Sequence, residues 1–405
     1  PTALIYNWQN EFEKFSIPLS YHLVVGNKKT RRQLLKEEKD LYLTSYGLLR
    51  EDIDLYQDRK FEVCVIDEAQ NIKNPNALLT RAVKKVNASV KFALTGTPIE
   101  NSLLELWSIF DFLMPGLLGS QMKFMTKYKN MEDEENLKKL KNQISPFLLR
   151  RKKKEVVKDL PDKIENNIYI DFHEKEKTLY ASLVKDTREK IDEMIRKEGF
   201  LKSRFLILQL LTKLRQLCID PSLLYVNYKE ESSKMETLKN ILIEAVRNEH
   251  KILIFSSFKG ALSKIEEMLS TEKMTYYRMD GSTPSKKRME YVENFNQDQT
   301  NVFLIMLKSG GTGLNLTAAD MVIHLDLWWN PQAENQATDR AHRIGQKKVV
   351  EVIKLITKGT IEEKILDLQK KKQKLSDLLI EGESENVFSA LTEEDVRNLL
   401  AYEQE

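Results

Sequence analysis

Two adjacent carboxylates follow an apolar, β-branched run in the first quarter of the chain. The run Phe61–Ile66 predicts a buried strand, and Asp67, Glu68, Ala69 and Gln70 come directly after it. A nucleotide hydrolase needs one carboxylate at the carboxyl edge of a parallel strand to hold Mg²⁺, and a second to orient and polarise the attacking water. We assign the metal to Asp67 and the water to Glu68. Taken alone, a simple acidic turn after a strand is the better interpretation.

A Thr-Gly-Thr-Pro turn follows the next predicted strand, with Thr95 and Thr97 on either side of Gly96. Proline ends such a turn. Hydroxyls placed there can sense a γ-phosphate through the acidic pair. The simpler alternative is a strand-to-helix turn capped by Thr97, and taken alone it is favoured.

A glycine-rich loop, Lys308–Leu316, follows a predicted strand later in the chain. Its three glycines, Gly310, Gly311 and Gly313, would let backbone amides approach a phosphate closely. No Gly-Lys-Ser/Thr sequence ends the loop, so it is not a Walker A phosphate loop. We predict that Gly313 lies near a nucleotide and that Lys308 meets a DNA phosphate.

Arg340 and Arg343 lie three residues apart in a pattern that predicts a helix running to Gln346. On a helix, residues at that spacing share a face. Two guanidinium groups that converge on a γ-phosphate form an arginine finger, which stabilises the charge of phosphoryl transfer. The alternative is a solvated basic helix face, which is the usual role of an arginine pair.

The composition narrows the class of protein without indicating a ligand. The chain has 405 residues, 64 Lys plus Arg against 61 Asp plus Glu, and a formal net charge of +3. With so even a balance, contact with nucleic acid must come from local basic patches. The two cysteines exclude a disulfide scaffold, and the cysteines and five histidines are not spaced as a zinc site. No apolar run reaches the length of a membrane span, so we expect an intracellular protein.

Short apolar strand patterns alternate with amphipathic stretches in two regions, which predicts parallel sheets built from βαβ units. Between these regions, Ser102–Arg247 is charged and mostly helical in pattern. We therefore predict an α/β fold with two parallel-sheet lobes and a helical insertion between them. The predicted strands are Tyr21–Val25, Leu41–Thr44, Phe61–Ile66 and Phe92–Leu94 in the first region, and Lys251–Phe255, Thr275–Met279, Val302–Leu307, Met321–Leu325 and Val349–Ile356 in the second.

Taken in order, these segments resemble the SWI/SNF-type family of helicase-like motors, which belongs to superfamily two. The tryptophan-pair block Trp328–Pro331 and the arginine block ending in Gln346 are together highly specific. The resemblance runs from the start of the chain to about Ile380. Its other segments are Asn7-Trp8 with Glu11 and Phe15, Thr44–Gly47, Asp67–Gln70, Leu94–Asn101, Pro146–Arg151, Asp280–Thr283 and the glycine loop.

The resemblance implies two RecA-like lobes with ATP and Mg²⁺ in the cleft between them, and translocation along double-stranded DNA rather than strand separation. It implies that the acidic pair and the arginine pair are catalytic, with Asp67 on Mg²⁺. It places the nucleotide beside Thr97, Gly311, Gly313 and Gln346. DNA-backbone contacts, without sequence preference, would come from Thr44, Ser45, Ser282, Lys286, Lys308, Ser309 and Trp328. For Trp328, burial in the core is an equal alternative.

The same resemblance suggests a division of the chain. We predict a partial first lobe over residues 1–120, helical protrusions and a linker over 121–232, and a second lobe over 233–358. A brace helix and a C-terminal tail would occupy 359–405. The expected substrate is a DNA-bound protein that the motor remodels or displaces, which predicts a DNA-associated location in the cell.

Two departures from the family pattern affect these expectations. Leu327 stands where the family usually has proline. The family's Gly-Lys-Thr phosphate loop has no match, because Gly26–Thr30 lacks the upstream glycine and predicts a turn after a strand. We therefore expect a first lobe truncated at its N-terminus and a fragment with little ATPase activity of its own. Two alternatives stay open: a DNA-binding module without catalysis, and a strand-separating helicase.

Overall fold

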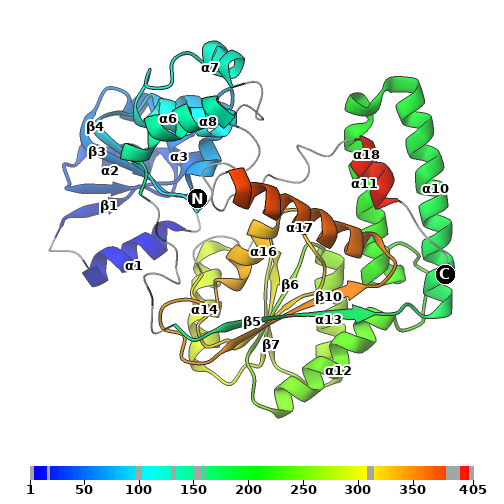
Figure 1. Ribbon diagram of the computed structural model, residues 1–405. Helices are drawn as coiled ribbons and strands as arrows, with labels where there is room; N and C mark the ends of the chain where they lie inside the picture. The colour runs from blue at the N-terminus through cyan, green and yellow to red at the C-terminus, as the bar shows by residue number, and fades with distance from the viewer. Residues whose placement is uncertain are drawn as a thin grey trace. The chain divides into compact units, whose positions relative to one another are not determined.

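The computed structural model describes residues 4–15, 19–96, 103–128, 134–149, 151, 157, 160–307, 314–379 and 393–400. The chain divides into two compact units: Pro1–Val156 with Ile380–Glu385, and Val157–Leu379 with Asn386–Glu405. Each unit contains parallel strands and helices (Figure 1). This arrangement confirms the predicted α/β class with two RecA-like lobes.

The first unit contains two separate pairs of parallel strands. β1 (Tyr21–Leu23) pairs with β2 (Leu41–Leu43), and β3 (Lys60–Ile66) pairs with β4 (Asn87–Ala93). Its helices are α1 (Ile5–Phe15), α2 (Lys28–Lys36), α3 (Tyr46–Glu51), α4 (Ile53–Tyr56), η2 (Ala69–Ile72), α5 (Leu78–Lys84), α6 (Leu103–Leu113), α7 (Gln121–Lys127), α8 (Glu134–Ile144) and η3 (Ser145–Phe147).

The two faces of the β3–β4 pair differ in burial. One face contributes to a core cluster built with side chains of α5 and α6. On the other face, the cross-strand pairs Val63–Val90 and Val65–Phe92 are each about half exposed in the described part of the chain. Parallel sheets are normally covered on both faces, so this short pair differs from an ordinary α/β sheet.

The second unit is built on one parallel sheet of six strands in the order β5-β10-β9-β6-β8-β7. The strands are β5 (Lys163–Ile170), β6 (Ile252–Ser256), β7 (Tyr276–Met279), β8 (Val302–Met306), β9 (Met321–His324) and β10 (Val350–Thr357). Every residue of the central strands β6 and β9 is buried. Burial on both faces explains why these strands have continuous apolar sequences rather than alternating ones.

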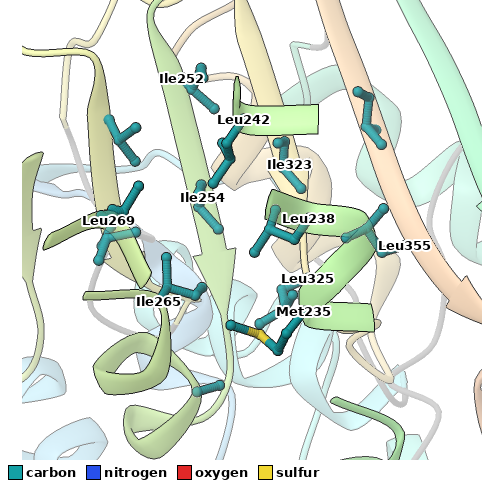
Figure 2. Close-up of a cluster of buried hydrophobic side chains, with 14 of the residues drawn as sticks. Met235, Leu238, Leu242, Ile252, Ile254, Ile265, Leu269, Ile323, Leu325 and Leu355 are labelled. Carbon is teal, nitrogen blue, oxygen red and sulfur yellow. The ribbon is translucent and has the colours of Figure 1, made fainter. Parts of the chain in front are cut away.

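Helices cover this sheet, and Figure 2 shows one of the resulting clusters, in which apolar side chains of α12 and α13 lie against β6 and β9. The helices of the unit are α10 (Glu174–Glu198), α11 (Phe200–Ile219), η4 (Pro221–Leu223), α12 (Ser233–Arg247), α13 (Lys259–Thr271), α14 (Ser285–Gln297), α16 (Pro331–Thr338), α17 (Ile361–Leu379) and α18 (Glu393–Leu399). None of the helices that the structure describes is long and apolar enough to cross a membrane.

One strand was missing from the sequence prediction. β5 lies inside Ser102–Arg247, which was expected to be mostly helical, and it pairs along its whole length with β10 at the edge of the sheet. Most of its residues are exposed, and polar residues interrupt its apolar ones, as an edge strand allows, so it has no continuous apolar run. The remainder of that segment is mostly helical where the structure describes it, and it includes the long neighbouring helices α10 and α11.

Candidate functional site

A cavity lies where β3 and β4 end in the first unit. Its volume is about 370 Å³, and it is lined by Asp67, Glu68, Ala93, Leu94, Thr95, Gly96 and Leu149. Ligands of parallel α/β sheets bind outside the carboxyl ends of the strands, which is where this cavity lies. The acidic pair and the Thr-Gly turn, which are separate in the sequence, therefore line one space.

Three hydrogen bonds hold Asp67 in place. The indole Nε1 of Trp8 donates to Oδ2 at 2.9 Å, and the backbone N–H of Glu68 donates to Oδ1 at 2.8 Å. The Tyr46 hydroxyl donates to the backbone carbonyl of Asp67 at 2.8 Å. Burial, followed by the charge of Asp67, raises the pKa of Tyr46, so this hydroxyl keeps its proton and remains a donor.

The surroundings of Asp67 fit the Mg²⁺ that the family resemblance implies. Each carboxylate oxygen accepts one hydrogen bond from the protein, so each retains lone-pair capacity for a cation. Proteins usually hold Mg²⁺ through one or two carboxylates together with waters and substrate phosphates, and not through a cage of protein ligands. In the described ranges, no three His, Cys, Asp or Glu side chains gather into such a cage.

Glu68 has a backbone conformation that is uncommon for a residue with a side chain. Its φ is 52° and its ψ is 54°, in the left-handed region. Its carbonyl accepts hydrogen bonds from the backbone N–H and the side-chain amide of Asn71, at 2.9 and 2.8 Å. Such conformations cost about 1–3 kcal/mol, persist where the surroundings enforce them, and cluster at functional sites.

A chain of side-chain hydrogen bonds joins the acidic pair to the Thr-Gly turn. Thr95 Oγ1 donates to Gln70 Oε1 at 2.8 Å, and Gln70 Nε2 donates to Glu68 Oε2. A displacement of the turn would therefore be felt at the Glu68 carboxylate. Thr97, the second hydroxyl of the turn, lies outside the described residues.

Arg340 and Arg343 do not lie on a helix, so the predicted shared helix face is wrong. α16 ends at Thr338, and turns follow it. The Arg340 N–H donates to the Ala337 carbonyl and the Arg343 N–H to the Ala341 carbonyl, each at 3.1 Å, which are carbonyls three and two residues earlier instead of the four of an α-helix. The segment Asp339–Gly345, which we call the arginine turn, therefore leaves the helical path before it reaches either arginine.

Long-range contacts explain why the helix stops. The backbone N–H of Leu316 donates to the Arg340 carbonyl at 2.9 Å. The imidazole Nε2 of His342 lies 2.7 Å from the carbonyl oxygen of Pro161, which can only accept, so this nitrogen carries the hydrogen. Both contacts tie the arginine turn to distant segments of the second unit, and tertiary structure overrides the local helical pattern.

Gln346, which directly follows the arginine turn, is buried. Its Nε2 donates to the carbonyls of Ala319 and Ala341, at 2.8 and 3.1 Å, and its Oε1 accepts from the backbone N–H groups of Lys347 and Lys348. The structure therefore gives its amide a role in holding the turn. Four other predicted ligand contacts lie outside the described residues: Gly311 and Gly313 at the nucleotide, and Lys308 and Ser309 at DNA.

Comparison with known proteins places this arrangement in a family. A family model for the SNF2-related domain matches residues 1–223, and one for the helicase conserved C-terminal domain matches residues 233–345. The chain belongs to the SNF2-related family. The acidic pair falls within the first match and the arginine turn within the second.

Several relatives of this SNF2-related chain have names that mention ATP-dependent helicases. An uncharacterized ATP-dependent helicase of Mycoplasma genitalium is 40% identical over 98% of this chain and 38% of its own length. A putative ATP-dependent helicase/translocase of Bacillus subtilis is 38% identical over 98% of this chain and 44% of its own. A TATA-binding protein-associated factor of Saccharomyces cerevisiae is 34% identical over 96% of this chain and 24% of its own.

The chain thus spans about two fifths of the length of its Mycoplasma and Bacillus relatives. Among solved structures, the Sulfolobus solfataricus SWI2/SNF2 ATPase core in complex with double-stranded DNA aligns with a TM-score of 0.51 and 35% identity. That alignment covers 100% of this chain and 86% of the other.

Two of the predicted DNA contacts of this SNF2-related chain form hydrogen bonds within the first unit. Thr44 Oγ1 donates to the Val24 carbonyl at 3.2 Å. Ser45 is only 2% exposed, and its hydroxyl accepts from the Leu48 N–H as the N-cap of α3. Ser45 therefore has little surface to offer to a phosphate.

Ser282 and Lys286 are both exposed in the second unit. The N–H and the hydroxyl of Ser282 donate to Asp280 Oδ1 at 2.9 and 2.5 Å, and these hydrogen bonds lower the pKa of Asp280. Lys286 lies on α14 and forms no ion pair with any residue that the structure describes. Its positive charge is available to a phosphate.

Trp328 is half-buried and packs against two core clusters of the second unit. Its backbone N–H donates to Glu334, and its carbonyl accepts from the Gln369 amide. The guanidinium carbon of the buried Arg215 lies 5.3 Å from its ring centroid. These contacts favour the core alternative for Trp328.

Sequence reasoning missed the residues that support Asp67 and Glu68. Trp8 and Tyr46 were noticed only as parts of family motifs, and Gln70 only as the last residue of the segment Asp67–Gln70. Their roles depend on contacts between segments 21 to 59 residues apart, and no local pattern reveals such contacts. Their presence in recognisable motifs was the one available signal.

Proposed function

We propose that this SNF2-related chain is the motor of an ATP-driven translocase on double-stranded DNA, which remodels or displaces DNA-bound proteins. The observation that carries the proposal is the cavity at the ends of β3 and β4, where Asp67 is fixed by three hydrogen bonds and Glu68 is held in a left-handed conformation. Family membership supplies the reaction class, since members and relatives are described as ATPases and ATP-dependent helicases.

The two residues of the acidic pair have different roles, one at the metal and one at the attacking water. Asp67 would hold Mg²⁺, and a metal bound there would neutralise negative charge that develops during phosphoryl transfer. Glu68 accepts a hydrogen bond from the attacking water and orients it. The hydrogen bonds from Thr95 to Gln70 and from Gln70 to Glu68 hold the Glu68 carboxylate in position. They also couple movement of the Thr-Gly turn to that carboxylate.

Arg340 and Arg343 supply positive charge to the same nucleotide. Their place on a turn, rather than on a helix, does not weaken this role, because the buried amide of Gln346 holds the turn by hydrogen bonds to the Ala319 and Ala341 carbonyls. We propose that Thr97, Gly311 and Gly313 complete the nucleotide contacts. An arginine finger contributes about a thousandfold or more to phosphoryl transfer.

Contacts with DNA are proposed to involve the sugar–phosphate backbone only. Ser282 and Lys286 are the exposed candidates in the described residues, and Lys308, Ser309 and Thr44 complete the set. Hydroxyl and ammonium groups of this kind position a protein on a duplex without reading its sequence. A motor that moves along DNA must bind it without sequence preference.

The protein that this motor displaces would be bound to DNA. Relatives named TATA-binding protein-associated factors suggest a substrate that sits on DNA as a discrete bound protein. A DNA-bound protein is therefore the class of substrate that we expect for this chain.

Two assays on the intact natural protein test the proposal against its alternatives. A translocase displaces the third strand of a DNA triplex in an ATP-dependent manner and leaves a blunt duplex unseparated. A strand-separating helicase would release single strands from the duplex. A binding module without catalysis would do neither, although it would still retain duplex DNA on a filter or gel.

A further inference from the structure

Trp8 contacts the carboxylate that the proposed mechanism assigns to the metal. Its indole Nε1 donates to Asp67 Oδ2 at 2.9 Å, across 59 residues of sequence. We propose that Trp8 is a positioning residue for metal binding: it fixes the rotation of the Asp67 carboxylate before a cation arrives. The inference rests on the proposed function, because it requires that Asp67 binds Mg²⁺.

The two carboxylate oxygens of Asp67 have separate donors. Trp8 holds Oδ2, and the backbone N–H of Glu68 holds Oδ1 at 2.8 Å. With the Glu68 donor alone, the carboxylate would be tethered at one oxygen and could swing about its side-chain bonds. With both donors in place, the remaining lone pairs point in a fixed direction. A metal then binds without the entropic cost of ordering the carboxylate.

An indole suits this position because of what it lacks. It has one N–H donor and no acceptor, so it cannot compete for the cation. It is uncharged, so it leaves the negative charge of Asp67 intact, whereas a lysine or arginine at this point would neutralise that charge. The ring of Trp8 lies 6.2 Å, centroid to centroid, from that of Phe12 on the same helix, and this packing restrains the direction of the N–H.

A purely structural role for Trp8 would be to fasten α1 to the first unit. α1 has another fastening that does not involve Asp67. The Tyr21 hydroxyl donates to Glu13 Oε1 at 2.6 Å and accepts from Gln9 Nε2 at 3.1 Å. Tyr21→Phe is therefore a matched control for Trp8→Phe, since each removes one hydrogen-bonding group from an aromatic side chain that secures α1.

The experiment measures ATP affinity of the intact natural protein twice, with saturating Mn²⁺ as the metal and with EDTA. Mn²⁺ takes the same hard oxygen ligands as Mg²⁺. The dissociation constant in EDTA divided by the dissociation constant with Mn²⁺ isolates the contribution of the metal. A general weakening of the nucleotide site changes both constants alike and leaves this ratio unchanged. Loss of an outer hydrogen-bond partner typically weakens metal binding by about 10- to 100-fold.

We expect Trp8→Phe to reduce this ratio by about tenfold or more while the EDTA constant stays the same, and Tyr21→Phe to leave the ratio within about twofold of wild type. An unchanged ratio in Trp8→Phe, or an equal reduction in both variants, would overturn the inference. A wild-type ratio near one would instead remove the metal role of Asp67 and the inference with it. If Trp8→Phe fails to fold, replacing the indole with its benzothiophene isostere deletes only the N–H.

Discussion

In the first unit, the acidic pair lies at the end of a two-stranded parallel sheet whose outer face is half exposed, whereas in the second unit the arginine turn borders a six-stranded sheet with fully buried central strands. Asp67 and Glu68 are positioned by a few hydrogen bonds to side chains on nearby segments. The arginines are positioned indirectly, through the buried Gln346 and the half-buried His342.

This difference indicates which substitutions each unit can accept without losing its fold. In the first unit, a single hydrogen bond to a carboxylate can be removed without disturbing a large core. In the second unit, charged groups are buried inside the fold itself, as with Lys234 and Glu362, which are both essentially inaccessible to solvent. Substitutions at the hydrogen bonds of Asp67 and Glu68 should therefore alter chemistry. Substitutions at buried ion pairs should alter stability, both at Lys234–Glu362 in the second unit and at Arg31–Asp52 in the first. The two arginines of the arginine turn are the exception in the second unit.

The largest expected effect is on turnover and comes from that exception. Arg343→Ala should lower DNA-stimulated ATP hydrolysis about a thousandfold, because an arginine finger contributes at least that much. The melting temperature should change little, since the turn is held through the backbone, His342 and Gln346. Lys347→Ala, an exposed neighbour, is the control. Loss of stability in step with activity would show instead that Arg343 holds the second unit together.

Breaking the buried ion pair between Lys234 and Glu362 should have the largest effect on folding. Lys234 Nζ donates to both carboxylate oxygens of Glu362, at 2.7 and 2.6 Å, and to the carbonyls of Leu325 and Leu355. Lys234→Met leaves the Glu362 charge buried without a partner and should lower the free energy of unfolding by about 3–5 kcal/mol. Chemical denaturation followed by circular dichroism measures this change.

Two further variants sharpen that prediction. Lys234→Met combined with Glu362→Gln removes both charges and should recover most of the lost stability. In the first unit, Lys139→Met breaks an exposed ion pair with Glu135 and should cost only about 0.3–0.5 kcal/mol. Equal costs for the buried and the exposed pair would contradict the expected difference between buried and exposed charges.

A smaller effect should appear in how the stability of the second unit depends on pH. Burial, and then the charges of Lys354 and Lys163, lower the pKa of His324 to about 3 from 6.5. The folded state therefore excludes a proton that the unfolded state binds below pH 6.5. His324 contributes stability that is complete above pH 6.5 and is lost by about 1.4 kcal/mol per pH unit as the pH falls toward 3.

The measurement is the free energy of unfolding at pH 7.0 and at pH 5.0 for wild type and His324→Phe. The phenyl ring can keep the stacking with Phe255. Other titrating groups contribute to both proteins alike, so the variant should show a shallower loss between the two pH values. Identical slopes would mean that His324 is protonated in the folded state.

The smallest expected effect is on DNA binding. Lys286→Ala should weaken binding to every duplex sequence alike and lower the slope of log K against log salt by about one unit. Lys229→Ala, another exposed lysine of the second unit, serves as the charge-matched control. A change in sequence preference would mean that Lys286 reads base edges rather than a phosphate.

The extent of sequence prediction differs between the units for physical reasons. The buried strands of the second unit were predictable because burial on both faces requires continuous apolar runs. β5 was not, since an edge strand can be polar. The acidic pair was located correctly at the end of β3, because its position depends on the strand just before it. The arginine turn was not, since contacts with Leu316 and Pro161 override the local helical pattern.

The central claim is that Glu68 acts on the attacking water in a DNA-stimulated ATPase. The most direct test compares ATP hydrolysis by the intact protein, with and without linear duplex DNA, in wild type and Glu68→Gln, with Glu62→Gln on the exposed part of β3 as control. We predict duplex-stimulated turnover in wild type and in the control. Glu68→Gln should bind ATP with unchanged affinity and lose about a hundredfold or more in turnover. Hydrolysis by Glu68→Gln at the wild-type rate would contradict the account.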